Sequence, residues 1–299
     1  TFEGNIDLSW KDIGDPNQLI TITSYGNVPA TIICKGEMSG IVYNGLGGLK
    51  ISDLILIGDV MAKPEHGGIN IGTAGKQLSN IQIYNVDISG FSLAGILIVA
   101  ESELVNIKNV IIKQCDLHHN ANGTHISGVE NLLIVDTKAN NNDWIRDDDG
   151  PVGGFGFAIY TCKNSAIMCC HGNYNGLLTR NAGGHGGAIV SDCDFCTLDS
   201  CVFVGNGDPT EQDGQGACIY GGYNCLVKNC FVSRNLNGGI SLFHDQFCRN
   251  VVGCVVTNCV AVNDTVSISM VGTILDCYIY NNDFYTESFN GKYHKTFDV

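Results

Sequence analysis

Three polar segments of the chain carry most of the side chains that could do acid–base chemistry. They span residues 143–150, 179–185 and 208–215. The first contains Asp148 and Asp149, and the third contains Asp213. Two carboxyl groups flanking a glycosidic bond can act as general acid and as base or nucleophile, and their separation distinguishes inverting from retaining hydrolysis. These acids predict a catalytic centre if the fold brings the segments together.

The residues expected in that centre fall into three groups. The catalytic group contains Asp148, Asp149, His185, Asp213 and Arg180. The substrate-binding group contains Trp144, as an aromatic platform, Arg146 and Glu211. It also contains residues expected at the opposite border of the face formed by the first strand of each coil: His125, His244 and Asp245, near Lys163, Asp192 and Asp194. Asp147 and Asp208 are candidate ligands of Ca²⁺, a cation that binds six to eight oxygens. The alternative interpretation is that these acids are solvated turn residues, since Asp followed by Gly is itself a turn signal.

The elements that would position these residues form a repeat. A small residue followed by apolar, any and apolar residues recurs at about 28-residue intervals, with loops of varying length. The motif begins at Gly40, Gly68, Gly95, Gly123, Gly156, Gly187, Gly216 and Gly239, and a related segment covers 266–270. Such a period predicts a β-solenoid, in which the strands of successive coils lie about 4.8 Å apart. The three polar segments precede consecutive motifs, so we expect them to emerge side by side.

Two further columns support this register. Cysteine occupies one repeat position, with Val86 and Val135 in other repeats: Cys115, Cys170, Cys201, Cys230 and Cys277. Five positions later comes asparagine: Asn120, Asn140, Asn175, Asn206, Asn235 and Asn282. Buried thiols behave as small hydrophobic groups, and stacked asparagines can bond along a ladder. We therefore predict an all-β, single-domain, right-handed parallel β-helix of about nine coils over residues 1–299, which could be a slice of a longer chain.

Composition narrows the classes of function. The formal net charge of -14 argues against nucleic acid as a partner, because no basic footprint for phosphates is present. No apolar run approaches the about 18 residues of a membrane span. The expected location is extracellular or on a cell or virion surface, with any export signal outside this chain, and a homo-oligomer is compatible with the sequence.

Several segments carry a resemblance to a known superfamily. Residues 2–6, 19–26, 30–33 and 51–58 resemble right-handed β-helix proteins of the pectate-lyase-like superfamily, especially polysaccharide-active bacterial and viral members. Gly183-Gly-His-Gly186, with Asp147 to Asp149 upstream, is similar to the Gly-His-Gly turn and aspartate pair of polygalacturonase-type glycoside hydrolases. The Asn-Thr-Asp turn and Arg-Ile-Lys strand of those enzymes do not occur here. In lyases of this fold Ca²⁺ neutralises a uronate carboxylate while a base abstracts the C5 proton, a role that the resemblance would give to Arg180 or His185.

Two hypotheses follow. The first is a polysaccharide-processing enzyme that cleaves glycosidic bonds in a groove along the first parallel sheet, with hydrolysis preferred over elimination because an acidic groove repels a polyuronate without calcium. No cofactor is required, although Ca²⁺ is compatible. The rival is a non-catalytic structural or glycan-binding rod, such as a virion spike, adhesin or surface-filament module. Long loops beside the acidic segments favour the enzyme, because a stalk should keep its coils uniform.

Overall fold

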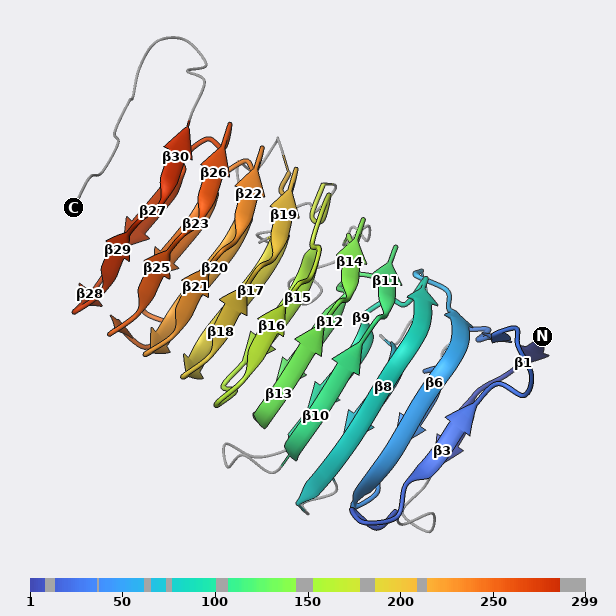
Figure 1. The fold of residues 1–299 in the computed structure, drawn as a ribbon. Helices are drawn as coiled ribbons and strands as arrows, with labels where there is room; N and C mark the ends of the chain where they lie inside the picture. Colours follow the sequence, from blue (N-terminus) through green and yellow to red (C-terminus); the bar gives the residue numbers. More distant parts are fainter. Residues whose placement is uncertain are drawn as a thin grey trace.

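The chain folds as a parallel β-helix. The computed structural model describes residues 1–8, 14–36, 38–61, 66–73, 77–100, 107–143, 153–177, 186–208 and 214–285. Every regular element within these ranges is a β-strand, and strands of successive coils pair in parallel. Figure 1 shows the coils stacked along one axis, from β1 at one end to β30 at the other. The predicted fold class is confirmed.

The strands form three sheets. The 12-stranded sheet, here called the first-strand sheet, contains β2 (Ile6–Leu8), β5 (Ile41–Tyr43), β7 (Gly67–Gly72), β9 (Ala94–Val99), β12 (Thr124–Ser127), β15 (Phe155–Tyr160), β17 (Gly186–Asp194), β20 (Gln215–Tyr223), β23 (Gly238–Phe243) and β27 (Ile268–Val271), with β24 (Val251–Val252) and β28 (Ile274–Leu275) off this path. The 14-stranded second sheet contains β1 (Phe2–Glu3), β4 (Ala30–Ile33), β6 (Gly47–Ile57), β8 (Leu78–Ser89), β10 (Ile107–Lys113), β13 (Val129–Val135), β16 (Ala166–Met168), β18 (Thr197–Asp199), β21 (Leu226–Lys228), β25 (Val255–Thr257) and β29 (Tyr278–Tyr280), with β3 (Ile20–Thr23), β11 (Asp116–His118) and β14 (Lys138–Asn140) off this path. The third sheet contains β19 (Val202–Val204), β22 (Phe231–Ser233), β26 (Val260–Val262) and β30 (Asp283–Tyr285).

The register of the first-strand sheet follows the sequence repeat. The paired residues run from Ile41 through Ile69, Ile96, Thr124, Phe157, Ala188, Ala217 and Ile240 to Ile268. In the first eight strands of this series the paired residue directly follows the repeated glycine. The described residues form about eight turns, so the coil count differs slightly from the nine expected.

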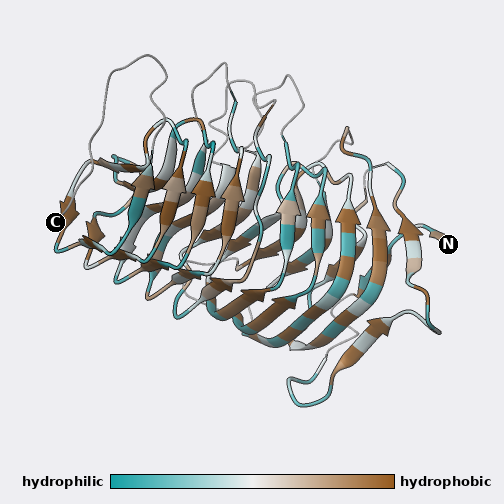
Figure 2. Cartoon of the chain, turned by 45° about the horizontal axis from the view of Figure 1, so that its top comes forward, coloured by the Kyte–Doolittle hydropathy of each residue, from teal (hydrophilic) through white to brown (hydrophobic). Residues whose placement is uncertain are grey.

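Side-chain alternation places the core inside the coils. Inward residues such as Ile69, Ile96 and Ile126 are fully buried, while their neighbours face outward. Figure 2 shows this as alternating hydrophobic and hydrophilic bands along the long strands β6 and β8. The described residues contain no helix long and apolar enough to cross a membrane.

An asparagine ladder runs through the turn that precedes the first-strand sheet in successive coils. The side-chain Oδ1 of Asn142 accepts hydrogen bonds from the backbone and side-chain nitrogens of Asn120, at 3.1 and 3.3 Å. The same pair of bonds joins Asn142 to Asn175, Asn175 to Asn206, and Asn206 to Asn235. The ladder ends at Asp264, whose Oδ1 accepts from both nitrogens of Asn235.

Two of the predicted ladder positions are therefore wrong. Asn142 occupies the rung assigned to Asn140, which accepts a bond from the Asn173 backbone outside the ladder. Asn282 caps the cysteine column, where its Oδ1 accepts from the Cys259 backbone at 2.8 Å. The spacing of five positions is kept at both rungs, from Thr137 to Asn142 and from Cys259 to Asp264, so the errors arise because threonine replaces cysteine in one coil and aspartate replaces asparagine in the other.

Nine of the cysteines lie in two columns inside the coils. One column contains Cys115, Thr137, Cys170, Cys201, Cys230 and Cys259. A second contains Ser165, Cys196, Cys225, Cys254 and Cys277, so Cys277 was assigned to the wrong column and Val135 stood in for Thr137. All fifteen thiols are free. Burial raises the pKa of Cys115 to about 12, so this thiol is protonated and acts as core packing.

Candidate functional site

The stems of the three polar segments are stacked on adjacent coils. The backbone nitrogen of Asp143 bonds to the Asn120 carbonyl, that of Gly176 to the Asn142 carbonyl, and that of Gly207 to the Asn175 carbonyl, at 2.7 to 2.9 Å. The chain re-enters the first-strand sheet at β15, β17 and β20, which are neighbours in that sheet. The described ends of each segment thus lie on neighbouring coils, at the edge of the first-strand sheet where these strands begin.

Most residues predicted for the catalytic centre lie outside the described residues: Trp144, Arg146, Asp147, Asp148, Asp149, Arg180, His185, Glu211 and Asp213. Asp208 is described and is 4% exposed. Within the described ranges, no group of three or more His, Cys, Asp or Glu residues could hold a metal ion.

The outward face of β15, β17 and β20 carries a second apolar cluster, separate from the core. Ala158, Ile189 and Cys218 are paired across these strands at an outward position, and they are buried together with Phe155. Tyr160, Tyr220 and Phe243 are partly buried against this cluster. An apolar floor with aromatic side chains is an unusual outward surface for a repeat whose hydrophobic residues belong inside.

The aromatic side chains form a row across the coils, here called the aromatic row. Tyr160, Ser191, Tyr220 and Phe243 pair in register on successive strands. The rings of Tyr220 and Phe243 are stacked with centroids 5.3 Å apart. His125 extends the row, since its ring centroid lies 4.9 Å from that of Tyr160. Burial lowers the pKa of His125, which favours the neutral imidazole.

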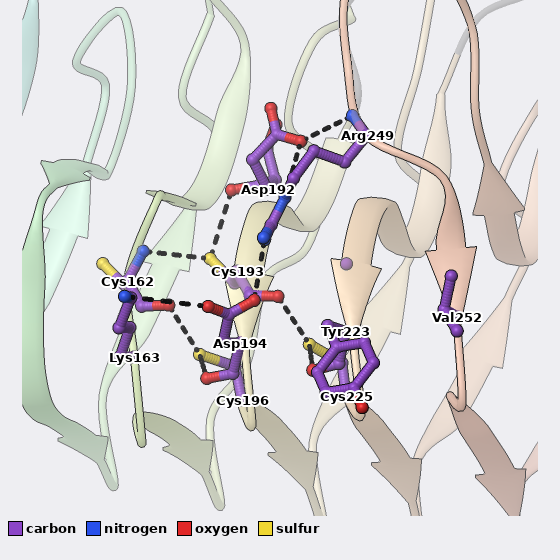
Figure 3. Close-up of polar contacts among 12 residues, drawn as sticks. Cys162, Lys163, Asp192, Cys193, Asp194, Cys196, Tyr223, Cys225, Arg249 and Val252 are labelled. Atoms are coloured by element: carbon purple, nitrogen blue, oxygen red, sulfur yellow. Dashed lines mark hydrogen bonds and ion pairs between the residues drawn. The ribbon is translucent and has the colours of Figure 1, made fainter. Parts of the chain in front are cut away.

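A charged cluster borders this face where the first-strand sheet turns into the second sheet (Figure 3). Arg249 lies between two carboxylates: its Nη2 is 2.9 Å from Asp194 Oδ1, and its Nε is 3.5 Å from Asp192 Oδ1. Asp192 Oδ1 also accepts a hydrogen bond from the Arg249 backbone at 2.8 Å. Lys163 Nζ lies 3.9 Å from the other oxygen of Asp194. Asp194 is thus held by cations from coils on either side, and Asp192 is held by Arg249.

The segment after β23 joins this border to the aromatic row. The Tyr220 hydroxyl donates to Asp245 Oδ2 at 2.6 Å, and His244 Nδ1 accepts from the Thr273 backbone at 3.0 Å. The bond from Tyr220 is the main cause of the lowered pKa of Asp245, so this acid is a carboxylate at neutral pH. An ionised acid in this position suits a base or a hydrogen-bond acceptor for hydroxyl groups better than a general acid.

The structure joins some predicted residues and adds others. Lys163, Asp192 and Asp194 form one cluster with Arg249, and His244 and Asp245 lie in the segment that leads to Arg249. Sequence reasoning missed Arg249 and the aromatic row. A signal for the row was present, because Tyr160, Tyr220 and Phe243 each stand four positions after a repeated glycine.

Comparison with known proteins supports the fold. No protein-family profile matches the chain, and no curated protein matches it. A solved structure of the pectate lyase Pel9A is 12% identical with a TM-score of 0.56, and the match covers 95% of this chain and 78% of the lyase. A lacto-N-biosidase of group GH136 from Eubacterium ramulus is 12% identical with a TM-score of 0.59, over 95% of this chain and 60% of that protein. This chain therefore shares the parallel β-helix fold of these two enzymes, and it spans less than two thirds of the biosidase.

Proposed function

We propose that the protein binds a polysaccharide along the outward face of the first-strand sheet and cleaves its glycosidic bonds. The aromatic row carries this proposal. Tyr160, Tyr220 and Phe243 stand in register on this face, with Ser191 on the coil between Tyr160 and Tyr220, and carboxylates that could accept hydrogen bonds from sugar hydroxyls border them. Ligand sites combine apolar and aromatic surface with a few convergent polar groups, and this face has both.

The charges of the face favour a neutral glycan. Among the described residues, its border carries the carboxylates of Asp192, Asp194 and Asp245, while the cations Lys163 and Arg249 are engaged by Asp192 and Asp194. A polyuronate would meet net negative charge there unless calcium were present. Hydrolysis is therefore preferred to elimination.

The chemistry is assigned to the polar segments beside this face. Asp148 or Asp149 with Asp213, two coils apart, would act as the acid and base pair, and crowding would raise the pKa of one of them. In a lyase, Arg180 or His185 would abstract the proton, with Asp147 and Asp208 as calcium ligands. Trp144, Arg146 and Glu211 would contact sugar units. The stacked stems of the segments support this placement, and an extracellular or surface location fits such a substrate.

The two structural neighbours support the same proposal. Their names are those of a pectate lyase and a lacto-N-biosidase, so this fold carries both elimination and hydrolysis of glycans. Their low identity leaves the choice of reaction to the residues of this chain.

The deciding experiment is a screen of the purified protein against neutral and acidic polysaccharides, with and without EDTA. It measures new reducing ends and the absorbance of unsaturated uronates. We expect reducing ends on a neutral glycan without that absorbance. Asp148→Asn and Asp213→Asn should each reduce the rate at least about 100-fold, while the control Asp7→Asn, an exposed acid of β2, should not.

Three results would change this assignment. Unsaturated products that disappear with EDTA would establish a calcium-dependent lyase instead. Full activity in both acid variants would refute the carboxylate pair. Absence of any product or binding across the panel would favour the non-catalytic rod.

A further inference from the structure

The connection after β23 is longer than those of the neighbouring coils. Tyr220 pairs with Phe243 and Gly222 pairs with Val251. In the coil of β20 only Gly221 lies between Tyr220 and Gly222. In the next coil residues 244–250 lie between the equivalent residues, Phe243 and Val251. In the following coil only Gly272 and Thr273 stand there, since Val271 and Ile274 are the equivalent residues. Residues 244–250, here called the cross-coil loop, are an insertion at this border.

The cross-coil loop reaches back over one whole coil. Arg249 bonds to Asp192 and Asp194 at the end of β17, although β20 lies between β17 and β23. Gly221 of the intervening coil makes this possible. A Cβ at Gly221 would lie 2.7 Å from both the Arg249 carbonyl oxygen and Asp192 Oδ1, and the φ angle of +67° also favours glycine.

The other end of the cross-coil loop is tied to the aromatic row. Asp245 accepts from the Tyr220 hydroxyl through Oδ2 and from the Phe247 backbone through Oδ1, at 2.6 and 2.8 Å. The Asp245 backbone donates to Cys248 Sγ at 3.4 Å. The loop is thus fixed at Asp245 and at Arg249, and Phe247 lies between these anchors.

Phe247 is 78% exposed. A single exposed apolar residue needs no explanation in general. This one is held by a loop that is bonded to the aromatic row at one end and to the charged border at the other. Ordering a loop before binding removes part of the entropic cost of association. An exposed ring on an anchored loop that is bonded to the aromatic row is suited to contact the same extended ligand.

We infer that the cross-coil loop is a specificity element of the glycan-binding face, with Phe247 as the contact for an additional sugar unit and Arg249 as the positioning residue. This inference rests on the proposed function. It identifies the ligand as a chain long enough to extend past the aromatic row to the loop. Short oligosaccharides would occupy the row alone.

The test measures the binding of an oligosaccharide length series, prepared from the glycan identified in the screen. Phe247→Ala should weaken the binding of long oligosaccharides about tenfold and leave that of the shortest bound ones unchanged. Tyr160→Ala, in the row and away from the loop, should weaken all lengths. The matched control is Tyr174→Ala, an aromatic residue that is 49% exposed and does not belong to this face.

The anchor is tested by a double-mutant cycle. Arg249→Ala and Gly221→Ala should each reproduce the length-dependent loss, and Phe247→Ala should add little to Arg249→Ala, because a released loop no longer positions the ring. Arg249→Lys should restore part of the binding. Far-ultraviolet circular dichroism and the melting temperature of Phe247→Ala should match those of the wild type.

The outcomes separate the two proposals. If Tyr160→Ala weakens binding but Phe247→Ala has no effect at any length, the loop assignment is wrong and the binding face stands. If Phe247→Ala weakens all lengths equally, Phe247 belongs to the central site and the length selection is wrong. If the wild type binds no glycan, both proposals fail.

Discussion

The inward and outward surfaces of the same coils follow opposite rules. Inside the turn that precedes the first-strand sheet, asparagine recurs on five successive rungs, and each rung is hydrogen-bonded to the next: Asn120, Asn142, Asn175, Asn206 and Asn235. On the outward face of the first-strand sheet, successive rungs carry Ser127, Tyr160, Ser191, Tyr220 and Phe243. A stacked interior position must satisfy its neighbours, whereas an outward position can vary to suit a ligand. Departures from the repeat on the outward face are therefore compatible with the proposed recognition, and constancy inside indicates stability.

Breaking the interior ladder should have the largest effect. Asn175→Ala removes the acceptor of two nitrogens of Asn142 and two donated bonds, to the Ala139 carbonyl and to Asn206. Several buried polar groups would lose their partners, each at about 1 to 3 kcal/mol, so we expect a loss of about 5 kcal/mol in the free energy of unfolding. Chemical denaturation measures it, with Asn27→Ala, an exposed bend residue, as the control. A loss similar to that of the control would show that the ladder does not stabilise the coils.

The end of the ladder should respond to pH. Asp264 is 1% exposed, its Oδ1 accepts from Asn235, and its Oδ2 has no hydrogen-bond partner among the described residues. In the preceding rung the atom equivalent to Asp264 Oδ2 is the side-chain nitrogen of Asn235, which donates to the Phe203 carbonyl. Phe203 pairs with Val232, so the equivalent acceptor for Asp264 is the Val232 carbonyl. A protonated Asp264 can imitate this amide and a carboxylate cannot. Burial accordingly raises the pKa of Asp264 to about 7.

The sign of this effect follows from proton linkage. The folded chain retains a proton on Asp264 that the unfolded chain loses near its ordinary pKa of 3.8. The stability contributed by this group is complete below that value and is lost as the pH rises through 7. Asp264→Asn supplies the donor at every pH, so its gain over the wild type should grow to roughly 4 kcal/mol at pH 8, at about 1.4 kcal/mol per pKa unit. Denaturation at pH 4, 6 and 8 measures the gain, and the exposed Asp276→Asn is the control; a gain independent of pH would contradict this account.

An outward change at the charged border should have the smallest effect on stability. Lys163→Gln removes an ion pair of 3.9 Å in which the lysine side chain is 51% exposed, and Arg249 still holds Asp194 at 2.9 Å. The expected change in the free energy of unfolding is below about 0.5 kcal/mol. A loss above about 1 kcal/mol would place Lys163 with the structural residues and would weaken the contrast between the two surfaces.

The sequence allowed prediction of the features that repeat. The motif glycines identified the first-strand sheet and its register, because apolar alternation and a constant period depend on local residue types. The asparagine ladder was recovered except at Asn142, where Thr137 replaces the column cysteine five positions earlier, and at the last rung, where Asp264 replaces asparagine. The contact of Arg249 with Asp192 could not be predicted, because it skips a coil and depends on the space left at Gly221. The acids of the polar segments remain a prediction, since they lie outside the described residues.

The asparagine ladder also sets the unit in which such a chain can change its length during evolution. Each rung presents the same acceptor to the rung before it and the same donors to the rung after it. Loss or duplication of one complete coil, such as the stretch from Asn206 to the residue before Asn235, leaves every remaining asparagine facing an equivalent partner. An insertion of any other size can be accommodated only in a loop, as in residues 244–250. New recognition elements in this fold should therefore arise at the turns, while the rod lengthens or shortens by whole coils.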